Sequence, residues 1–423
     1  MEKSETTALL KSKILRILTL LLLVRLCLYI PVPNVDLDIF SQGQNINPMF
    51  GFARTLTGSS FLGIGSLGIL PYINASIIIQ LLTPIFPFLE RLQKEEGELG
   101  RQQLTRYTRY LTFAWALGLS TVIAFALVKP IVFNWTLLLA LKIIFSLTLG
   151  SILSMWFAEL ISEESLGNGS SMIIFINIVG SIPNSFNNLL EKLNNSLLLD
   201  NFITLGVGLL FYIFIVLIIV IFQDSYRAIN IVSARQLNLN YSEQTQQLAE
   251  LKNSYIPIKL NQGGIMPLVF SSTIAALIFY PAQIFISSKL GNILPFVPTA
   301  LTFFSFALNI ILVIFFSCFY ALLVLKPEDI SQNLAKMAYS IPGVRQGKQT
   351  TYFLEQVINR AAFMGGLFLA FLAFFPLLLG NFFQFNLFKN VTSLLILIGV
   401  ITDVTTKIRG YLIAKNYEGF QNT

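Results

Sequence analysis

Few residues in this 423-residue chain could carry out chemistry, and their spacing does not suit catalysis. The absence of histidine excludes a Ser-His-Asp triad, a histidine general base and histidine metal ligands. Gly343 to Gln349 superficially resembles a phosphate-binding loop, but it is one residue short between the glycines, and Gln349 replaces the Ser or Thr that would bind magnesium. Cys27 and Cys318 lie in separate apolar stretches, which favours buried thiols over a disulfide. We therefore predict no enzyme activity, no cofactor and no metal site.

The composition indicates a membrane protein. Hydrophobic residues make up 55% of the chain and charged residues only 12%, whereas soluble domains carry roughly 25% charged residues. A chain this apolar satisfies its backbone polar groups in lipid by forming helices. We predict an all-α polytopic membrane protein. The frequent Phe, Ile, Leu and Asn also suggest an AT-rich genome, such as that of an organelle.

Ten apolar stretches have a length suited to crossing a bilayer. They span approximately residues 14–31, 67–89, 108–128, 136–158, 170–183, 203–223, 264–286, 300–325, 360–380 and 391–409. The fifth is short, and a re-entrant element is its alternative. The polar N-terminus leads into the first stretch without a small-residue cleavage site, so we predict no removable signal peptide.

The distribution of Lys and Arg predicts the orientation. Of the 28 Lys and Arg, 21 fall on the side of the two termini and five on the opposite side, while Arg25 and Lys142 lie inside spans. Because positive charge accumulates on the cytosolic side, both termini are expected there or on its topological equivalent. The loop after the fourth span has no Lys or Arg and is the one inconsistency.

Three segments between spans are unusual. The predicted cytosolic loops at about 224–262 and 326–359 are long for a transporter, which suggests docking of a soluble partner; a solvated connector is the alternative. The outer segment 48–66 is moderately apolar and rich in Gly and Ser, but too interrupted to span. Its glycines would allow a short helix to pack closely or move.

The sequence contains an internal repeat. Gly68–Ser76 and Gly264–Ser272 share the pattern G-I-[LM]-P-x-[IV]-x-[AS]-S. Asn168–Ile174 and Asn390–Ile396 share N-x-[ST]-S-[LM]-[IL]-I. Both pairs lie five spans apart, and five is odd, so the second half must be inverted. Inverted repeats place the functional path between the halves, near the middle of the bilayer.

The repeat also predicts what lines that path. Ile73 is equivalent to Val269, and Ile174 is equivalent to Ile396, so branched aliphatic side chains occupy these positions. A hydrophobic constriction would block ions by dewetting yet yield to a bulky guest. Ordinary packing between helices is the alternative interpretation.

Two other classes of function stay open from the residues alone. A secondary transporter with inverted repeats would need charges within the membrane, for which Arg25, Lys142 and Asp403 are the candidates. A membrane scaffold would instead use the two long loops to recruit soluble proteins.

Several stretches of more than ten residues resemble the SecY/Sec61-alpha family of protein translocase subunits, and the resemblance covers nearly the whole chain. They read GILPYINASIIIQLLT, KEEGELGRQQLTRYTRY, SLGNGSSMIIFINIV, LNQGGIMPLVFSS, KPEDISQNLAKMAYSIPGVRQGKQTTYFLEQVINR and TSLLILIGVITD. The resemblance implies two inverted halves of five helices each, residues 1–200 and 201–423. It also implies a protein-conducting channel for unfolded polypeptides that releases signal or transmembrane segments laterally into lipid.

The resemblance assigns roles to individual residues. The pore ring would comprise Ile69, Ile73, Ser170, Ile174, Val269 and Ile396, with Ser170 departing from the apolar pattern. The plug would fall at about 48–61 and include Met49, Phe50, Gly51, Arg54 and Gly58. The lateral gate would include Asn74, Ser76, Gln80, Ser272 and Thr273. Partner docking would use Arg345, Lys348, Arg101 and Arg106.

The resemblance further implies partners and a location. The partners would be a small SecE-like subunit, a SecG-like subunit, a SecA-type motor ATPase, the ribosome, preproteins with signal sequences, and the lipid bilayer. The loop after the sixth span lacks Lys and Arg between 238 and 249, which departs from the family's basic pattern. Composition and this departure favour the plastid thylakoid membrane, with a bacterial inner membrane as the alternative.

Overall fold

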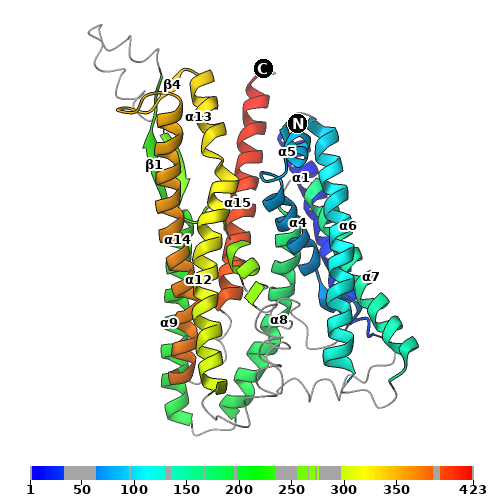
Figure 1. Cartoon of the computed structure of the whole chain (residues 1–423). Helices are drawn as coiled ribbons and strands as arrows, with labels where there is room; N and C mark the ends of the chain where they lie inside the picture. Colours follow the sequence, from blue (N-terminus) through cyan, green and yellow to red (C-terminus); the bar gives the residue numbers. More distant parts are fainter. Residues whose placement is uncertain are drawn as a thin grey trace. The chain divides into compact units, whose positions relative to one another are not determined.

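Helices dominate the computed structural model of the chain (Figure 1). The structure describes residues 2–32, 63–94, 97–129, 135–164, 167–194, 198–233, 255–264, 266–271, 274–275, 297–383 and 391–421. Two compact units are present: the first comprises Met1–Phe202 and Ile396–Thr423, and the second comprises Ile203–Leu395. The all-α fold class is confirmed, while the count of ten spans and the inverted halves stay predictions.

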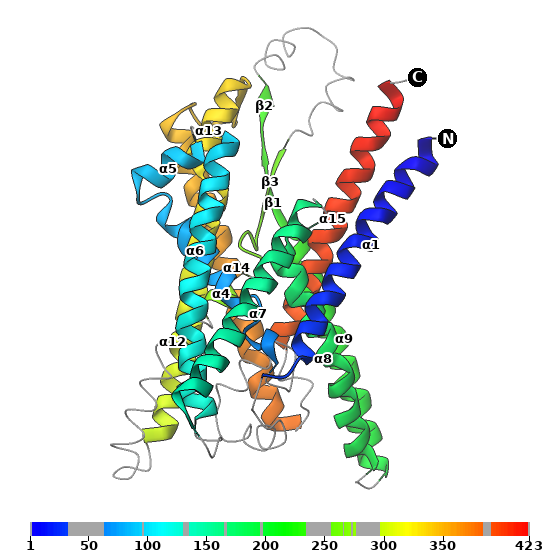
Figure 2. The same ribbon diagram turned by 90° about the vertical axis from the view of Figure 1, so that its right-hand side faces the viewer.

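The first unit is a bundle of long helices. Its elements are α1 (Glu2–Tyr29), the 3₁₀ turn η1 (Ile64–Leu67), α4 (Leu70–Leu82), α5 (Pro87–Lys94), α6 (Gly97–Ile123), the π turn η2 (Ala124–Val128), α7 (Leu137–Glu163), α8 (Gly169–Asn194), the start of α9 (Leu198–Asp224) and most of α15 (Val391–Gln421). Helix α6 packs on α4, α5 and α7, and α7 also packs on α1, α8 and η1. Figure 2 shows α1 beside α15, where Lys13 lies over the ring of Tyr411 at 5.7 Å.

Small residues on α7 explain its central place in this bundle. Gly150, Ser151, Ser154 and Ala158 are all buried, and small residues let helix backbones approach closely in a membrane. A Cβ at Gly150 would overlap the backbone carbonyl of Ile64, so only glycine fits at this contact between α7 and η1.

Hydroxyl groups inside apolar helices bond to their own backbone. Thr108 donates to the carbonyl of Leu104 at 2.9 Å, Thr112 to that of Thr108 at 2.7 Å, and Ser154 to that of Gly150 at 2.9 Å. This pairing lets polar side chains enter a lipid-embedded bundle without leaving donors unsatisfied.

The second unit joins long helices to small sheets. Its elements are most of α9, β1 (Tyr226–Asn230), β2 (Val232–Ser233), β3 (Tyr255–Lys259), α12 (Val297–Leu325), α13 (Pro327–Lys336), β4 (Tyr339–Ser340), α14 (Lys348–Phe383) and the start of α15. Helices α12 and α14 lie side by side (Figure 1). Their backbones approach at Gly366, where a Cβ would come within 3.1 Å of Cα of Ile314. Ser317 on α12 donates to the carbonyl of Ala362 on α14 at 3.0 Å.

Two antiparallel strand pairs organise the polar loops of this unit. β1 pairs with β3, with Tyr226 opposite Lys259 and Asn230 opposite Tyr255. β2 pairs with β4, so Val232 after α9 lies opposite Ser340 after α12. The second pair therefore ties together the two long loops that the sequence predicted as docking segments.

Several predicted loop regions are helical. The polar residues 90–109 belong largely to α5 and α6, and α14 begins at Lys348 although its apolar span was predicted from 360. Hydropathy indicates which part of a helix lies in lipid. It does not indicate whether the same helix continues into water. Pro327 at the start of α13, with Glu328 and Asp329 in its first turn, explains the third such helix, because these residues suit a helix N-terminus.

Three described stretches are long and apolar enough to cross a membrane. They are Ile64–Leu82, Leu137–Glu163 and Ala307–Lys336, with mean hydropathies of 1.5, 2.1 and 2.7. Each overlaps a predicted span, which supports those three assignments.

Candidate functional site

The residues predicted to form the pore ring are all buried. Ile69 directly precedes α4 and Ile73 lies in its first turn, and each is only 2% exposed. Ser170, Ile174 and Ile396 are also buried in the first unit, and Val269 is buried in the second. Burial is required of a closed ring, and it is equally required of ordinary packing, so the ring itself stays a prediction.

The two copies of the proline motif share one backbone feature. Gly68 and Gly264 both have a positive φ, +54° and +57° respectively. A side chain there would be strained, and in each copy a helix starts within two residues. This agreement supports the internal repeat. Pro71 lies in the first turn of α4, so it starts the helix and does not kink its interior.

Ser170 is the one polar member of the predicted ring. Its hydroxyl donates to Oδ1 of Asn168 at 2.9 Å, and its backbone N–H points to the same oxygen at 3.3 Å. The hydroxyl is thus occupied at the start of α8. This hydrogen bond lowers the polarity that Ser170 would otherwise present to a seal.

The lateral-gate residues differ in their surroundings. Asn74 is 1% exposed, and neither polar atom of its side chain has a partner among the described residues. One turn further, Gln80 donates to the hydroxyl of Ser76 at 3.3 Å. Ser272 and Thr273 lie outside the described residues. The structure therefore describes one side of the predicted gate.

The predicted plug, including Met49, Phe50, Gly51, Arg54 and Gly58, lies outside the described residues. The described residues before and after this segment contact each other. Pro31 and Gly63 form an antiparallel bridge, and the N–H of Ile64 donates to the carbonyl of Ile30 at 2.8 Å. The described residues on the two sides of 33–62 thus lie next to each other.

The predicted docking residues are exposed on polar parts of the chain. Arg345 lies in a turn before α14, held by Thr350, whose hydroxyl donates to the carbonyl of Arg345 at 2.9 Å. Lys348 starts α14, and Arg101 and Arg106 lie exposed on α6. Their exposure leaves all four guanidinium or ammonium groups available to a partner.

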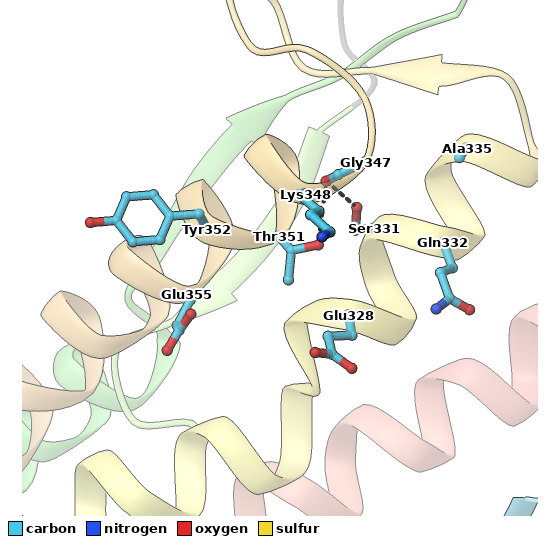
Figure 3. Close-up of a pocket in the computed structure, with 9 residues that line it drawn as sticks. All are labelled: Glu328, Ser331, Gln332, Ala335, Gly347, Lys348, Thr351, Tyr352 and Glu355. Carbon is cyan, nitrogen blue, oxygen red and sulfur yellow. Dashed lines mark hydrogen bonds between the residues drawn. The ribbon is translucent and has the colours of Figure 1, made fainter.

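An open groove beside Lys348 was not predicted from the sequence (Figure 3). It has a volume of about 580 Å³ and lies between α13 and the first turns of α14. Its lining residues are Glu328, Ser331, Gln332, Ala335, Gly347, Lys348, Thr351, Tyr352 and Glu355. Ser331 donates to the carbonyl of Gly347 at 3.2 Å, which joins the two helices at the base of the groove. Only tertiary packing creates this groove, since its halves come from separate helices.

Two ion pairs at the end of α7 were also missed. Arg109 on α6 contacts Glu159 at 2.8 Å, and Arg16 on α1 contacts Glu164 at 3.2 Å. The loop after the fourth span, which has no Lys or Arg, therefore begins beside basic residues of its neighbours. Acidic residues at this end of α7 are thus paired with Arg16 and Arg109.

Two tyrosines form an exposed pair on the β1–β3 sheet. The rings of Tyr226 and Tyr255 stack at 5.9 Å between centroids, and their hydroxyls are 3.4 Å apart. The hydrogen bond to Tyr255 raises the pKa of Tyr226 above its ordinary value of 10.0. The pair thus favours neutral phenols and stiffens the loop that carries it.

No set of three Cys, Asp and Glu side chains gathers as a metal ion would need within the described part of the chain. The features that the structure does describe are buried aliphatic positions, a repeated helix-starting motif and an exposed basic turn.

Solved structures share this fold. A protein-conducting channel matches with a TM-score of 0.62 and 17% identity, covering 93% of this chain and 90% of that chain. Sec61 in the canine ribosome-channel complex from the endoplasmic reticulum matches with a TM-score of 0.59 and 16% identity, covering 93% and 90%. The fold class is therefore that of the protein-conducting channels.

The sequence comparisons identify the family. The SecY family model matches residues 63–405. The protein translocase subunit SecY of Emiliania huxleyi is 69% identical over 422 residues and covers 100% of both chains. The corresponding subunit of Guillardia theta is 43% identical over 419 residues, covering 97% of this chain and 96% of its own. The chain belongs to the SecY family.

Proposed function

We propose that this chain is the channel-forming subunit of a protein translocase. It conducts unfolded polypeptides across a membrane and releases hydrophobic segments sideways into lipid. The observation that carries the proposal is the 69% identity, over the full length of both chains, to a protein translocase subunit. The shared fold with protein-conducting channels agrees with it. The SecY family match does not favour a secondary transporter.

The seal is proposed to be a ring of aliphatic side chains. Ile69, Ile73, Ile174, Val269 and Ile396 supply its apolar members, and Ser170 completes it. Such side chains close against ions by dewetting and widen around an extended chain. They offer no hydrogen bonds, so they do not select one passenger sequence over another. The segment at 48–61 is the proposed plug.

Release into lipid is proposed to depend on hydrophobicity. A signal helix gains about 25 cal/mol for each Å² of apolar surface that leaves water. This gain favours opening of a gate that includes Asn74, Ser76 and Gln80 on one side and Ser272 and Thr273 on the other. A polar segment lacks the gain and continues through the pore.

The proposed partners supply energy and complete the channel. The chain has no complete nucleotide-binding motif, so we assign energy supply to a SecA-type motor ATPase or to a ribosome. Ribosome-bound channels among proteins of the same fold support the ribosome as a partner. A SecE-like subunit, with a SecG-like subunit, would stabilise the assembly. Arg345 and Lys348 are the proposed contacts for the soluble partner.

The proposed location is the plastid thylakoid membrane with both termini on the stromal side. Relatives from algae support the plastid setting, and the excess of Lys and Arg beside the termini supports the orientation.

Reconstitution tests this function directly. The chain is purified in mild detergent with its associated subunits and placed in vesicles with a SecA-type ATPase and a preprotein. We expect ATP-dependent protection of the preprotein from external protease, and no protection when its signal sequence is deleted. Uptake of a small solute driven by an ion gradient, without preprotein transport, would instead establish the transporter alternative.

A further inference from the structure

Besides those of Asn74 and Trp115, four buried polar atoms of the first unit have no hydrogen-bond partner among the described residues. They are Nη1 of Arg25 in α1, Oγ of Ser66 in η1, Oγ of Ser151 in α7 and Oδ1 of Asn177 in α8. Helix α1, helix α7 and η1 pack on one another, and α8 packs on α1 and α7. Ser151 and Asn177 are 0% and 2% exposed. Buried polar groups are normally paired, so four on neighbouring elements call for a further polar partner.

Close contacts place Ser66 and Ser151 at the same depth in the bundle. The carbonyl of Ile64 occupies the position that a Cβ of Gly150 would need. Ser66 is two residues beyond Ile64, and Ser151 directly follows Gly150. Both hydroxyls therefore lie within about one helical turn of this contact.

Contacts of α1 bring Arg25 to the same level. A Cβ at Gly65 in η1 would lie 3.3 Å from the backbone of Cys27, two residues from Arg25. The guanidinium of Arg25 lies where a Cβ of Gly180 would be, and it stands 5.6 Å from the ring centre of Tyr29. Tyr29 and α8 thus fix the direction of this side chain.

The antiparallel contact of α7 and α8 adds Asn177. A Cβ at Gly169 would overlap the carbonyl of Ala158, so these two residues face each other. Asn177 lies eight residues along α8 from Gly169, and Ser151 lies seven residues along α7 from Ala158. Asn177 and Ser151 each lie about 11–12 Å from this contact, on the same side of it, so the two side chains lie at one depth.

The four groups together can donate hydrogen bonds to one acceptor. Arg25 carries a full positive charge, and the two serine hydroxyls can donate. The amide of Asn177 can also donate, because its oxygen and nitrogen exchange places on a flip of the side chain. A water molecule would leave the charge of Arg25 uncompensated in an apolar bundle, which is costly. A small anion would satisfy all four.

The described acidic residues of these elements lie too far along the helices to form an ion pair with Arg25. On α7 the nearest is Glu159, about 12 Å from the level of Ser151, and on α8 it is Glu191, roughly 16 Å from Gly180. On α1 it is Glu5, roughly 30 Å from Arg25.

We propose that Arg25, Ser66, Ser151 and Asn177 form a buried binding site for a small inorganic anion such as chloride. The bound anion holds α1, η1, α7 and α8 together by accepting hydrogen bonds from all four at one depth. The inference does not require the proposed function to hold.

Halide-dependent stability tests the site. The full chain, purified with its associated subunits, is unfolded by heat at chloride concentrations from zero upward, with gluconate holding ionic strength constant. The unfolding temperature is expected to rise with chloride and saturate, because a ligand that binds only the folded state stabilises it. Ser151→Ala is expected to raise the half-saturating concentration about tenfold, the loss typical of one hydrogen bond to a charged group.

Two further variants and a control complete the test. Gly180→Ala places a methyl group against the guanidinium of Arg25 and should remove the chloride dependence while retaining the charge. Ser120→Ala removes a buried hydroxyl that already donates to the carbonyl of Leu117 at 3.0 Å, so its chloride dependence should match that of the unaltered chain. Bromide should give anomalous density beside Arg25. Chloride dependence that is absent, or equal in all variants, would overturn the proposal.

Discussion

At the scale of single residues, the proposed seal depends on side chains that are apolar, branched and buried. Ile73 illustrates the requirement: it is 2% exposed and follows the positive-φ glycine and the proline that start α4. The equivalent position in the repeat is Val269, which is also buried. Two equivalent positions with the same chemistry are expected of a ring built from both halves.

Replacing Ile73 with Asn should loosen the seal. The amide attracts water into a constriction that excludes ions by dewetting. We expect a higher ion leak through reconstituted channels and more efficient transport of preproteins with weak signal sequences. Fluorescent ion-flux and protease-protection assays measure both effects.

Ile77→Asn is the matched control, since Ile77 is also buried in α4 but lies outside the proposed ring. Both substitutions should cost roughly 1–3 kcal/mol of stability, because each buries an amide. An equal leak in the two variants would remove Ile73 from the ring.

At the scale of elements, the first unit is held by close approach at small residues and by ion pairs at one end of α7. Gly150 allows η1 to contact α7, and Arg16 and Arg109 bring α1 and α6 to the same helix. The ion pairs are partly exposed, so close packing is the larger contribution to stability.

Gly150→Ala should therefore destabilise the first unit. The new methyl group would overlap the backbone carbonyl of Ile64, which cannot move without displacing η1. We expect a loss of about 1–3 kcal/mol, typical of overpacking, measured by thermal or denaturant unfolding in detergent.

Gly118→Ala provides the comparison for that substitution. Gly118 lies inside α6, and a Cβ there meets nothing within 4 Å. Alanine should leave stability unchanged or raise it by up to about 1 kcal/mol, because it favours helix more than glycine does. Equal losses in the two variants would argue against close packing at η1.

The tyrosine pair of the β1–β3 sheet makes a pH-dependent prediction. The pKa of Tyr226 is raised in the folded chain, so the contribution of the pair is present below the ordinary pKa of 10.0 and is lost as pH rises through the higher folded value. In an ultraviolet titration, Tyr255→Phe should lower the pKa of Tyr226 towards 10.0. Tyr339→Phe, which alters a tyrosine outside this pair, should leave that titration unchanged.

At the scale of the whole molecule, the proposed function assigns energy supply and conduction to different chains. The docking turn at Arg345 is exposed and is linked to the long helix α14 by the Thr350 hydrogen bond. The β2–β4 pair ties the loop after α9 to this same region. A partner bound at this surface therefore contacts both long loops through one connected structure.

Arg345→Glu should impair transport without impairing folding. The substitution reverses the charge of an exposed side chain, which leaves packing unchanged but opposes an acidic partner surface. We expect at least about a tenfold loss of transport, the effect of roughly 1.4 kcal/mol at an interface, with normal membrane insertion. Protease protection of a preprotein measures the rate.

Lys336→Glu serves as the control, because Lys336 is an exposed cation in the same loop but outside the proposed contact. Transport by Arg345→Glu at the rate of Lys336→Glu would contradict the docking role.

The composition and the apolar stretches predicted the fold class and three spans that the structure describes, because burial in lipid selects residue type directly. The repeated G-I-x-P motif predicted two matching helix starts, and both have a glycine with a positive φ. Helix ends in water were not predictable. Lys348 begins α14 well before the apolar span, since hydropathy carries no signal there.

By itself the sequence determined the family, the helical membrane fold and the buried aliphatic positions, because each depends on local residue type and order. Tertiary structure alone decided which distant groups meet. Arg109 reaches Glu159, Val232 pairs with Ser340, and α1, η1, α7 and α8 each carry a buried polar atom without a described partner. The physical reason is that these contacts depend on how helices align against one another, which side-chain packing fixes and local sequence does not.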